Sequence, residues 1–490
     1  MIGVSLFKYI VYDMNKLIKI ASIIILICFS DNLLSQPTTW QRIFGGIRDD
    51  YARITLETKD GNYLMIGERQ ITLITGFPVS QISLTKFNSY GNILWTKNIG
   101  DSLRGSSPTS AVEMRSGNIL ITYMHNDWGN LMKIDAEGNV IWDSSYIHPV
   151  SGFYFISLIN NQKNVIINGD RVGGMDYIAA IFKLDTNGNL YWSKGYNDGL
   201  SYIGYLNNDN AFYSVGLKNN STAFAIKKDT SGKVIWYREI SNNNHFFRFE
   251  GISQISNSTF ITIGNISIPG KYVYSGLYAT KYDSSGNFYW NKNYLSDSMY
   301  ARRIIKARNN VYVITGGQGE PVGKLCSIDS SGNLLLKKFY YYNSTAIVDY
   351  DNIQNCSDSG FIISGYYNHS PSSYSDFLVL KTDKNFNFSI SSIENNNIHF
   401  PELDFIVSTY PNPFNPEINI KIELKKKRNL SITIYDSEGK EMKSISKLYS
   451  ESGTTLLKIK TIDLNLSSGI YFLRVSDSEY SIINKIIYLK

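Results

Sequence analysis

Short apolar runs separated by Gly- and Asn-rich turns follow one another along most of the chain, and two phrases built on this pattern recur. Most copies of the first phrase read Lys-x-Asp-x-x-Gly-x-x-x-Trp, with an apolar run on each side of the turn. The copies start at residues 86, 133, 183, 227, 281, 327 and 381. Because Asp accepts backbone N–H groups and Gly adopts positive φ, each copy predicts a β-hairpin.

The second phrase is an apolar run that ends in glycine and lies between copies of the first. It ends at Gly67, Gly169, Gly216, Gly264, Gly316 and Gly365, and the remaining copy has Tyr123 instead. It follows a turn of its own, as at residues 58–62, so each repeat contains four strands. Four-stranded repeats spaced 44 to 54 residues apart predict propeller blades. We therefore expect an all-β chain with a seven-bladed β-propeller over residues 37–395; an open stack or two half-propellers is the alternative.

The tryptophans keep the phase of the repeat and indicate how the ring closes. Ile93 and Trp95 alternate on one strand face, so the indole can pack against the next unit. The seventh hairpin ends at Ile390, without a tryptophan, whereas Trp40 opens the repeat region in phase. We therefore expect the first strand to complete the last blade and remove its open edge.

The N-terminal residues read as an export signal over residues 1–36. Lys16 and Lys19 precede the apolar run 20–29, and Ser35 is a small residue suited to the position before a cleavage site. The run is too short for a membrane anchor, so we expect cleavage and no transmembrane segment in the mature chain. Residues 1–13 are an upstream extension in this interpretation.

The pattern changes after residue 395. A linker at 396–409 leads to residues 410–490, where Ile418, Ile420 and Ile422 alternate with polar residues as in half-buried strands. About 80 residues of this kind predict a small immunoglobulin-like β-sandwich.

Four motifs occur in order in this C-terminal region. They are PNPFNP (411–416), a Tyr-Asp-x-x-Gly turn (435–439), SGIYFLRV (468–475) and KIIYLK (485–490). Together they resemble the C-terminal sorting domain of the type IX secretion system, over about residues 405–490. The residues that carry the resemblance are Pro411, Asn412, Pro413, Tyr435, Gly439, Gly469, Tyr471 and Lys485.

That resemblance implies a Bacteroidetes-like source and two steps of export. The signal peptide takes the chain across the inner membrane, and the type IX secretion machinery then recognises the sorting domain and delivers the protein to the cell surface or the medium. An ordinary appended immunoglobulin-like domain is the alternative. The propeller phrases resemble quinoprotein and WD-type blades, and more closely those of secreted bacterial propellers with Trp-x-Lys-x-Gly-Gly and Asp-Gly-Gly-Tyr repeats. Neither resemblance implies a quinone.

Composition narrows the chemistry. The net charge of +6 is spread thinly, and the basic run 425–428 reads as a solvated turn, so we expect no nucleic-acid partner. No two of the five histidines are close in sequence. Cys28 leaves with the signal, and whether Cys326 and Cys356 pair stays open. The repeated Asp residues are explained by turns rather than by calcium. We expect no catalytic residue, no cofactor and no metal site.

Function is then expected in the longer loops after Gly67, Gly264 and Gly365, which are rich in Tyr, Ser and Asn. These residue types suit carbohydrate or protein contacts, although an AT-rich codon bias explains them equally well. We expect a propeller that binds a glycan or protein without catalysis. The alternatives are a polysaccharide lyase or glycosidase with carboxylates at the propeller channel, and a structural envelope component.

Overall fold

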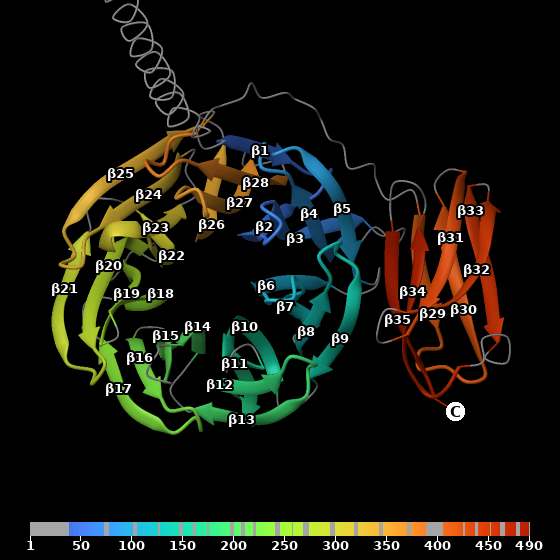
Figure 1. Ribbon diagram of the computed structural model, residues 1–490, viewed down its shortest axis with the longest axis horizontal. Helices are drawn as coiled ribbons and strands as arrows, with labels where there is room; N and C mark the ends of the chain where they lie inside the picture. Colours follow the sequence, from blue (N-terminus) through green and yellow to red (C-terminus); the bar gives the residue numbers. More distant parts are fainter. Residues whose placement is uncertain are drawn as a thin grey trace, which may run out of the picture.

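The computed structural model describes residues 39–388 and 405–489, apart from short gaps in both ranges. Most of these residues form antiparallel strands, arranged as a ring of sheets with a separate pair of sheets beside it (Figure 1). The expected signal peptide and most of the expected linker lie outside the described residues.

Seven four-stranded sheets of the described residues form the ring, and we number them 1 to 7 along the chain. Sheets 1 to 4 are β2 (Asp50–Glu57), β3 (Tyr63–Thr72), β4 (Pro78–Phe87), β5 (Ile93–Ile99); β6 (Ser106–Glu113), β7 (Ile119–His125), β8 (Trp128–Ile134), β9 (Val140–Tyr146); β10 (Val150–Ile159), β11 (Asn164–Gly173), β12 (Asp176–Asp185), β13 (Leu190–Tyr196); and β14 (Leu200–Leu206), β15 (Phe212–Lys218), β16 (Thr222–Lys228), β17 (Val234–Ile240). Sheets 5 to 7 are β18 (Phe246–Ser256), β19 (Thr259–Ser267), β20 (Tyr274–Asp283), β21 (Phe288–Tyr294); β22 (Tyr300–Lys306), β23 (Tyr312–Gly317), β24 (Val322–Ile328), β25 (Leu334–Tyr341); and β26 (Ile347–Asn355), β27 (Phe361–Asn368), β28 (Ser375–Thr382) with β1 (Trp40–Phe44). One 3₁₀ turn, η4 (Arg308–Asn310), precedes β23.

Each sheet starts with a strand near the ring axis and ends with a strand at the rim (Figure 1). Sheet 7 joins the two ends of the ring, because β1 pairs with β28 from Trp40–Lys381 to Phe44–Phe377. Side chains from both ends of the ring, including Phe44, Met65 and Phe377, share one buried cluster. The expected closure by the first strand is thus confirmed, and the ring is a β-propeller.

An aspartate holds the turn after the third strand in six of the seven ring sheets, and Asn88 takes its place in sheet 1. In sheet 5, one Asp283 carboxylate oxygen accepts the N–H groups of Ser285 and Asn287 at 2.8 Å, and Gly286 has a φ of 81°. The same carboxylate–amide contact four residues ahead occurs at Asp135, Asp185, Asp229, Asp329 and Asp383. These contacts confirm the turn-forming role of the repeated aspartates.

Each phased tryptophan packs on the hairpin glycine of the following sheet. The Trp236 indole lies over Gly286, donates to the Ser284 carbonyl at 3.0 Å, and stacks on Phe260 with centroids 5.8 Å apart. A Cβ on Gly286 would lie 2.8 Å from the indole. The equivalent pairs are Trp40–Gly91, Trp95–Gly138, Trp142–Gly188, Trp192–Gly232 and Trp290–Gly332.

The junction between sheets 6 and 7 departs from this rule at both positions. Leu336 replaces the tryptophan, and Phe386, with a φ of 62°, replaces the glycine. The Phe386 ring is buried and stacks on Phe361 at 4.8 Å, and the Tyr340 hydroxyl donates to the Phe386 carbonyl. At this junction the aromatic ring therefore comes from the turn of sheet 7, whereas at the other junctions it comes from a tryptophan of the preceding sheet.

The C-terminal residues form two packed sheets. One contains β29 (Phe405–Tyr410), β30 (Glu417–Leu424) and β33 (Gly453–Lys460), and the other contains β31 (Arg428–Tyr435), β32 (Glu441–Ser450), β34 (Gly469–Ser476) and β35 (Ser481–Tyr488). Their core is aliphatic and includes Ile418, Ile420, Ile422, Leu430 and Ile432. Strand β29 begins within the residues we expected to be linker and ends one residue beyond them. It belongs to the C-terminal sheets, since its backbone pairs along β30 and its Val407 is buried in this core.

The four-stranded C-terminal sheet contacts the propeller beside β5 (Figure 1). Phe472 is buried, and Tyr435 is partly buried, in a cluster that includes Trp95 and Ile99. No helix among the described residues has the length and apolar character needed to span a membrane.

Candidate functional site

The innermost strand of every sheet carries a register shift of the β-bulge type at the same place. In β18, for example, Phe249 pairs with Gly264 and Gly251 with Ile263, so Glu250 is left without a partner in the ladder. We call the seven extra residues the bulge ring. They are Arg53, Thr109, Tyr154, Tyr202, Glu250, Arg302 and Asp351.

The bulge explains the glycine of the second sequence phrase. A Cβ on Gly264 would overlap the carbonyl oxygen of Arg248, which the bulge pushes toward the neighbouring strand. Gly67, Gly169, Gly316 and Gly365 face a carbonyl of the inner strand in the same way. A bulge re-aims the side chain of the extra residue relative to its neighbours in the strand.

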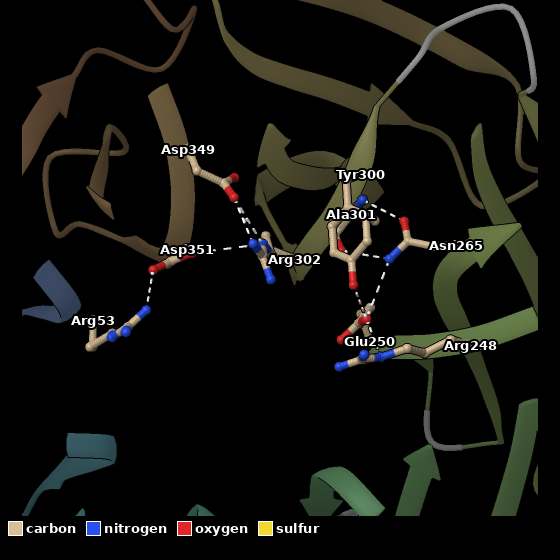
Figure 2. Close-up of polar contacts among 9 residues, drawn as sticks. All are labelled: Arg53, Arg248, Glu250, Asn265, Tyr300, Ala301, Arg302, Asp349 and Asp351. Carbon is tan, nitrogen blue, oxygen red and sulfur yellow. Dashed lines mark hydrogen bonds and ion pairs between the residues drawn. The ribbon is translucent and has the colours of Figure 1, made fainter. Parts of the chain in front are cut away.

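Ion pairs connect three charged members of the bulge ring, Arg53, Arg302 and Asp351, across neighbouring sheets (Figure 2). Arg53 contacts Asp351 and Glu68, each at 3.1 Å. Arg302 contacts Asp349 at 2.7 Å and Asp351 at 3.7 Å. Sheets 6, 7 and 1 are thus joined through one chain of charges that faces the opening.

A second set of contacts surrounds Glu250 (Figure 2). Its carboxylate contacts Arg248 at 2.5 Å and accepts the Tyr300 hydroxyl at 3.0 Å and the Asn265 amide at 3.4 Å. Asn265 also accepts the Ala301 N–H at 2.7 Å. Sheets 5 and 6 are therefore held together by a network that uses the acceptors of Glu250.

Burial alters the acidity of these groups. Desolvation raises the pKa of Asp349 to about 6, although Arg302 opposes the shift. It also raises the pKa of Glu250 against the pull of Arg248 and Arg302. Burial alone would lower the pKa of Arg302, but Asp349 and Asp351 outweigh it and raise that pKa. Asp349 and Glu250 therefore take up protons more readily than exposed carboxyl groups do.

A cavity of about 640 Å³ lies along the axis, beyond the bulge ring. Its lining comes from the later residues of six innermost strands: β2, β6, β10, β18, β22 and β26. Aliphatic side chains such as Ile252 and Ile304 alternate there with Ser, Asn and Gln side chains. Two cations, Arg303 and Lys306, are among the described lining residues, and Arg303 follows the bulge residue of β22 directly.

Sequence reasoning did not find the bulge ring or the cavity. Its members share no residue type, because they include arginine, threonine, tyrosine and acids. The signal that could have found them is the repeated glycine inside a strand, which marks close approach of a neighbouring backbone. Of the tyrosines in the long loops, Tyr374 is exposed and bonds Arg48 at 2.8 Å, Tyr367 is buried, and Tyr272 lies outside the described residues.

The residues of the expected sorting motif lie in different parts of the C-terminal sheets. Asn412, between Pro411 and Pro413, accepts the N–H of Ile487 at 2.8 Å. The Tyr471 hydroxyl donates to the Ser467 carbonyl at 2.8 Å. The remaining positions are Tyr435 at the end of β31, Gly469 at the start of β34, Lys485 opposite Phe472 in β35, and Gly439, which lies outside the described residues.

The described residues include both cysteines of the expected mature chain. Cys326 and Cys356 are both buried and unpaired with each other, in separate hydrophobic clusters. Across the described residues, no three His, Cys, Asp or Glu side chains come together in a way that could hold a metal ion.

Comparison with known families identifies the domain that the C-terminal residues form. Residues 408–489 match the secretion system C-terminal sorting domain. The sorting domain directs its protein to the cell surface or the medium, and it implies the type IX secretion machinery as a partner. A comparison with curated proteins found no match.

Three solved structures are similar to this chain at low identity. A protein of unknown function from Bacteroides caccae is 11% identical, over 53% of this chain and 90% of that one, with a TM-score of 0.37. The Dos1 propeller is 11% identical, over 72% and 98%, with a TM-score of 0.44. Raptor from Chaetomium thermophilum is 10% identical, over 73% and 30%, with a TM-score of 0.47. Such scores bear on neither fold nor function, and the fold rests on the strand pairing described above.

Proposed function

We propose that this protein is an exported binding module, displayed on or released from the cell surface, whose propeller holds a glycan or protein ligand in its central cavity without catalysis. In this proposal residues 1–36 are a cleaved signal, and the seven four-stranded sheets are the blades of a seven-bladed propeller within residues 37–395. An immunoglobulin-like sorting domain, with its first strand at 405, follows a short linker. The sorting machinery reads the motif residues from Pro411 to Lys485.

The cavity carries this proposal. It has the size of a typical small-ligand site and mixes aliphatic surface with a few hydroxyl and amide groups. The charged groups beside it are engaged with one another: Arg302 with Asp349, and Glu250 with Tyr300. A carboxylate that already accepts several hydrogen bonds is poorly placed to transfer a proton to a substrate.

Binding can be tested with a glycan array and a surface pull-down on the full mature chain. Ser157 lines the cavity. The substitution Ser157→Trp should abolish binding, because the indole would fill the space that the ligand occupies. Ser145→Trp on the exposed side of β9 is the matched control and should bind as the wild type does. If array and pull-down both come back empty for the wild type, the binding role is wrong.

One observation favours the alternative of a polysaccharide-acting enzyme. Asp349 and Glu250 both have raised pKa values, as a general acid requires, and each contacts an arginine of an innermost strand. Wild-type protein that cleaves a polysaccharide, together with loss of cleavage in Glu250→Gln, would establish the enzyme in place of the binding module.

The export step has a separate test. Deletion of residues 405–490 should leave the propeller in the periplasm, because the sorting domain is removed while the N-terminal signal remains. Fractionation followed by immunodetection reports the location. Normal surface display of the truncated chain would contradict export through this domain.

A further inference from the structure

Arg303 differs from the other arginines of the channel in its partners. Arg53 and Arg302 each contact two carboxylates. No described residue forms a hydrogen bond or an ion pair with the guanidinium of Arg303, which packs over the ring of Phe155 at 5.6 Å. Asp351 and Glu250 are close enough to act on it electrostatically, but both are occupied by other partners.

The charges that line the cavity all have one sign. Its described lining includes Arg303 and Lys306 but no aspartate or glutamate. Lys306 donates one proton to the Ile255 carbonyl and keeps two others. Burial lowers the pKa of Arg303 to about 10, which leaves it charged at neutral pH and short of solvation.

We propose that the central cavity binds an acidic carbohydrate, with Arg303 as the partner of the sugar's carboxylate. A guanidinium presents paired N–H donors that match a carboxylate. The surrounding groups suit the rest of a sugar ring, because hydroxyl and amide side chains alternate with aliphatic ones. These polar groups are Ser110, Ser157, Ser253, Gln254, Asn352 and Gln354. The inference rests on the proposed binding function and specifies its ligand class.

The test uses the full mature chain on an array of uronic-acid-bearing oligosaccharides and their neutral counterparts, with acidic peptides as a third set. Wild-type protein should prefer the uronic-acid probes. Arg303→Gln should weaken that binding by about tenfold or more, since a charge-assisted pair is lost. Lys337→Gln removes the same charge from the exposed rim strand β25 and should leave binding unchanged.

Arg303→Lys keeps the charge without the paired donors, and we expect intermediate affinity. If Arg303→Gln does not fold, Arg303→Lys serves as the test variant in its place. Equal binding of neutral and acidic sugars, preference for acidic peptides, or unchanged uronate binding in the folded Arg303 variants would overturn this inference. Neutral-sugar binding that Ser157→Trp abolishes would overturn it and still leave the proposed binding function intact, whereas no binding of any probe would count against both.

Discussion

The rim of the propeller and its axis are built from the same repeat, yet they use it in opposite ways. At the rim, six of the junctions between neighbouring sheets of the described ring have a tryptophan on a glycine. At the axis, the bulge residue occupies the same position in each inner strand and differs in chemistry from sheet to sheet, as Arg53, Thr109 and Glu250 show. The repeat therefore fixes a backbone position at the axis and leaves its side chain free to vary.

The one irregular rim junction supports the same distinction. Where Leu336 replaces the tryptophan, Phe386 replaces the glycine and fills the space from the opposite side. A change at the rim is matched by a second change that restores packing. The residues of the bulge ring, in contrast, share no common side-chain type. Such variation is expected of residues that form a binding site rather than of residues that hold the fold together.

The largest effect is expected at the rim. Trp236→Ala removes an indole that stacks on Phe260 and bonds the Ser284 carbonyl, so we expect a loss of about 3–5 kcal/mol in unfolding free energy. Urea denaturation of the propeller measures it. Tyr289→Ala, on the exposed side of β21, is the control and should cost less than about 1 kcal/mol. Equal losses in the two variants would show that the phased tryptophans do not hold the ring.

At the axis, Arg302→Gln should lower the unfolding free energy by about 2 kcal/mol, because the buried Asp349 carboxyl loses the partner that offsets its desolvation. The double variant Arg302→Gln/Asp349→Asn removes the carboxyl as well and should recover most of the loss. Thermal unfolding of the four proteins in the cycle tests the coupling. Additive losses would mean that the ion pair is dispensable to the ring.

A finer comparison separates backbone strain from packing at the rim. Gly286 and Gly117 have φ values of 81° and 87°, but only Gly286 has a neighbour, Trp236, within reach of a Cβ. Gly117→Ala should cost about 1 kcal/mol from strain alone. Gly286→Ala should cost more, since the indole must also move. Chemical denaturation of both variants gives the difference, and equal costs would argue against the tryptophan–glycine contact.

The smallest effect concerns pH at the axis. The pKa of Asp349 rises to about 6 on folding, so the folded chain binds its proton more tightly than the unfolded one does. This contribution to stability is present at low pH and is lost as the pH rises from about 4 through 6. Asp349→Asn removes the dependence, so its melting temperature relative to the wild type should increase over that interval. A constant offset from pH 4 to 7 would contradict the shift.

The repeated elements of this molecule could be predicted from the sequence, whereas the bulge ring and strand β29 could not. The hairpins, the packing face of Trp95 and the pairing of Trp40 with the last sheet follow from spacing, because each depends on residues that recur. The bulge ring does not, since Arg302 and Asp351 share only a backbone position. In the C-terminal region, alternation predicted β30, but β29 fell in the expected linker because nothing in its sequence distinguishes it from an extended connection.

The pairing of β1 with β28 makes completeness a condition for folding. The first strand of the ring pairs with a strand more than 300 residues later, as the pair Trp40–Lys381 shows. Sheet 7 is therefore complete only when the whole repeat region is present. A chain that stops early keeps unpaired strand edges at both ends, which invite association with other chains. Late, long-range closure of this kind also slows folding.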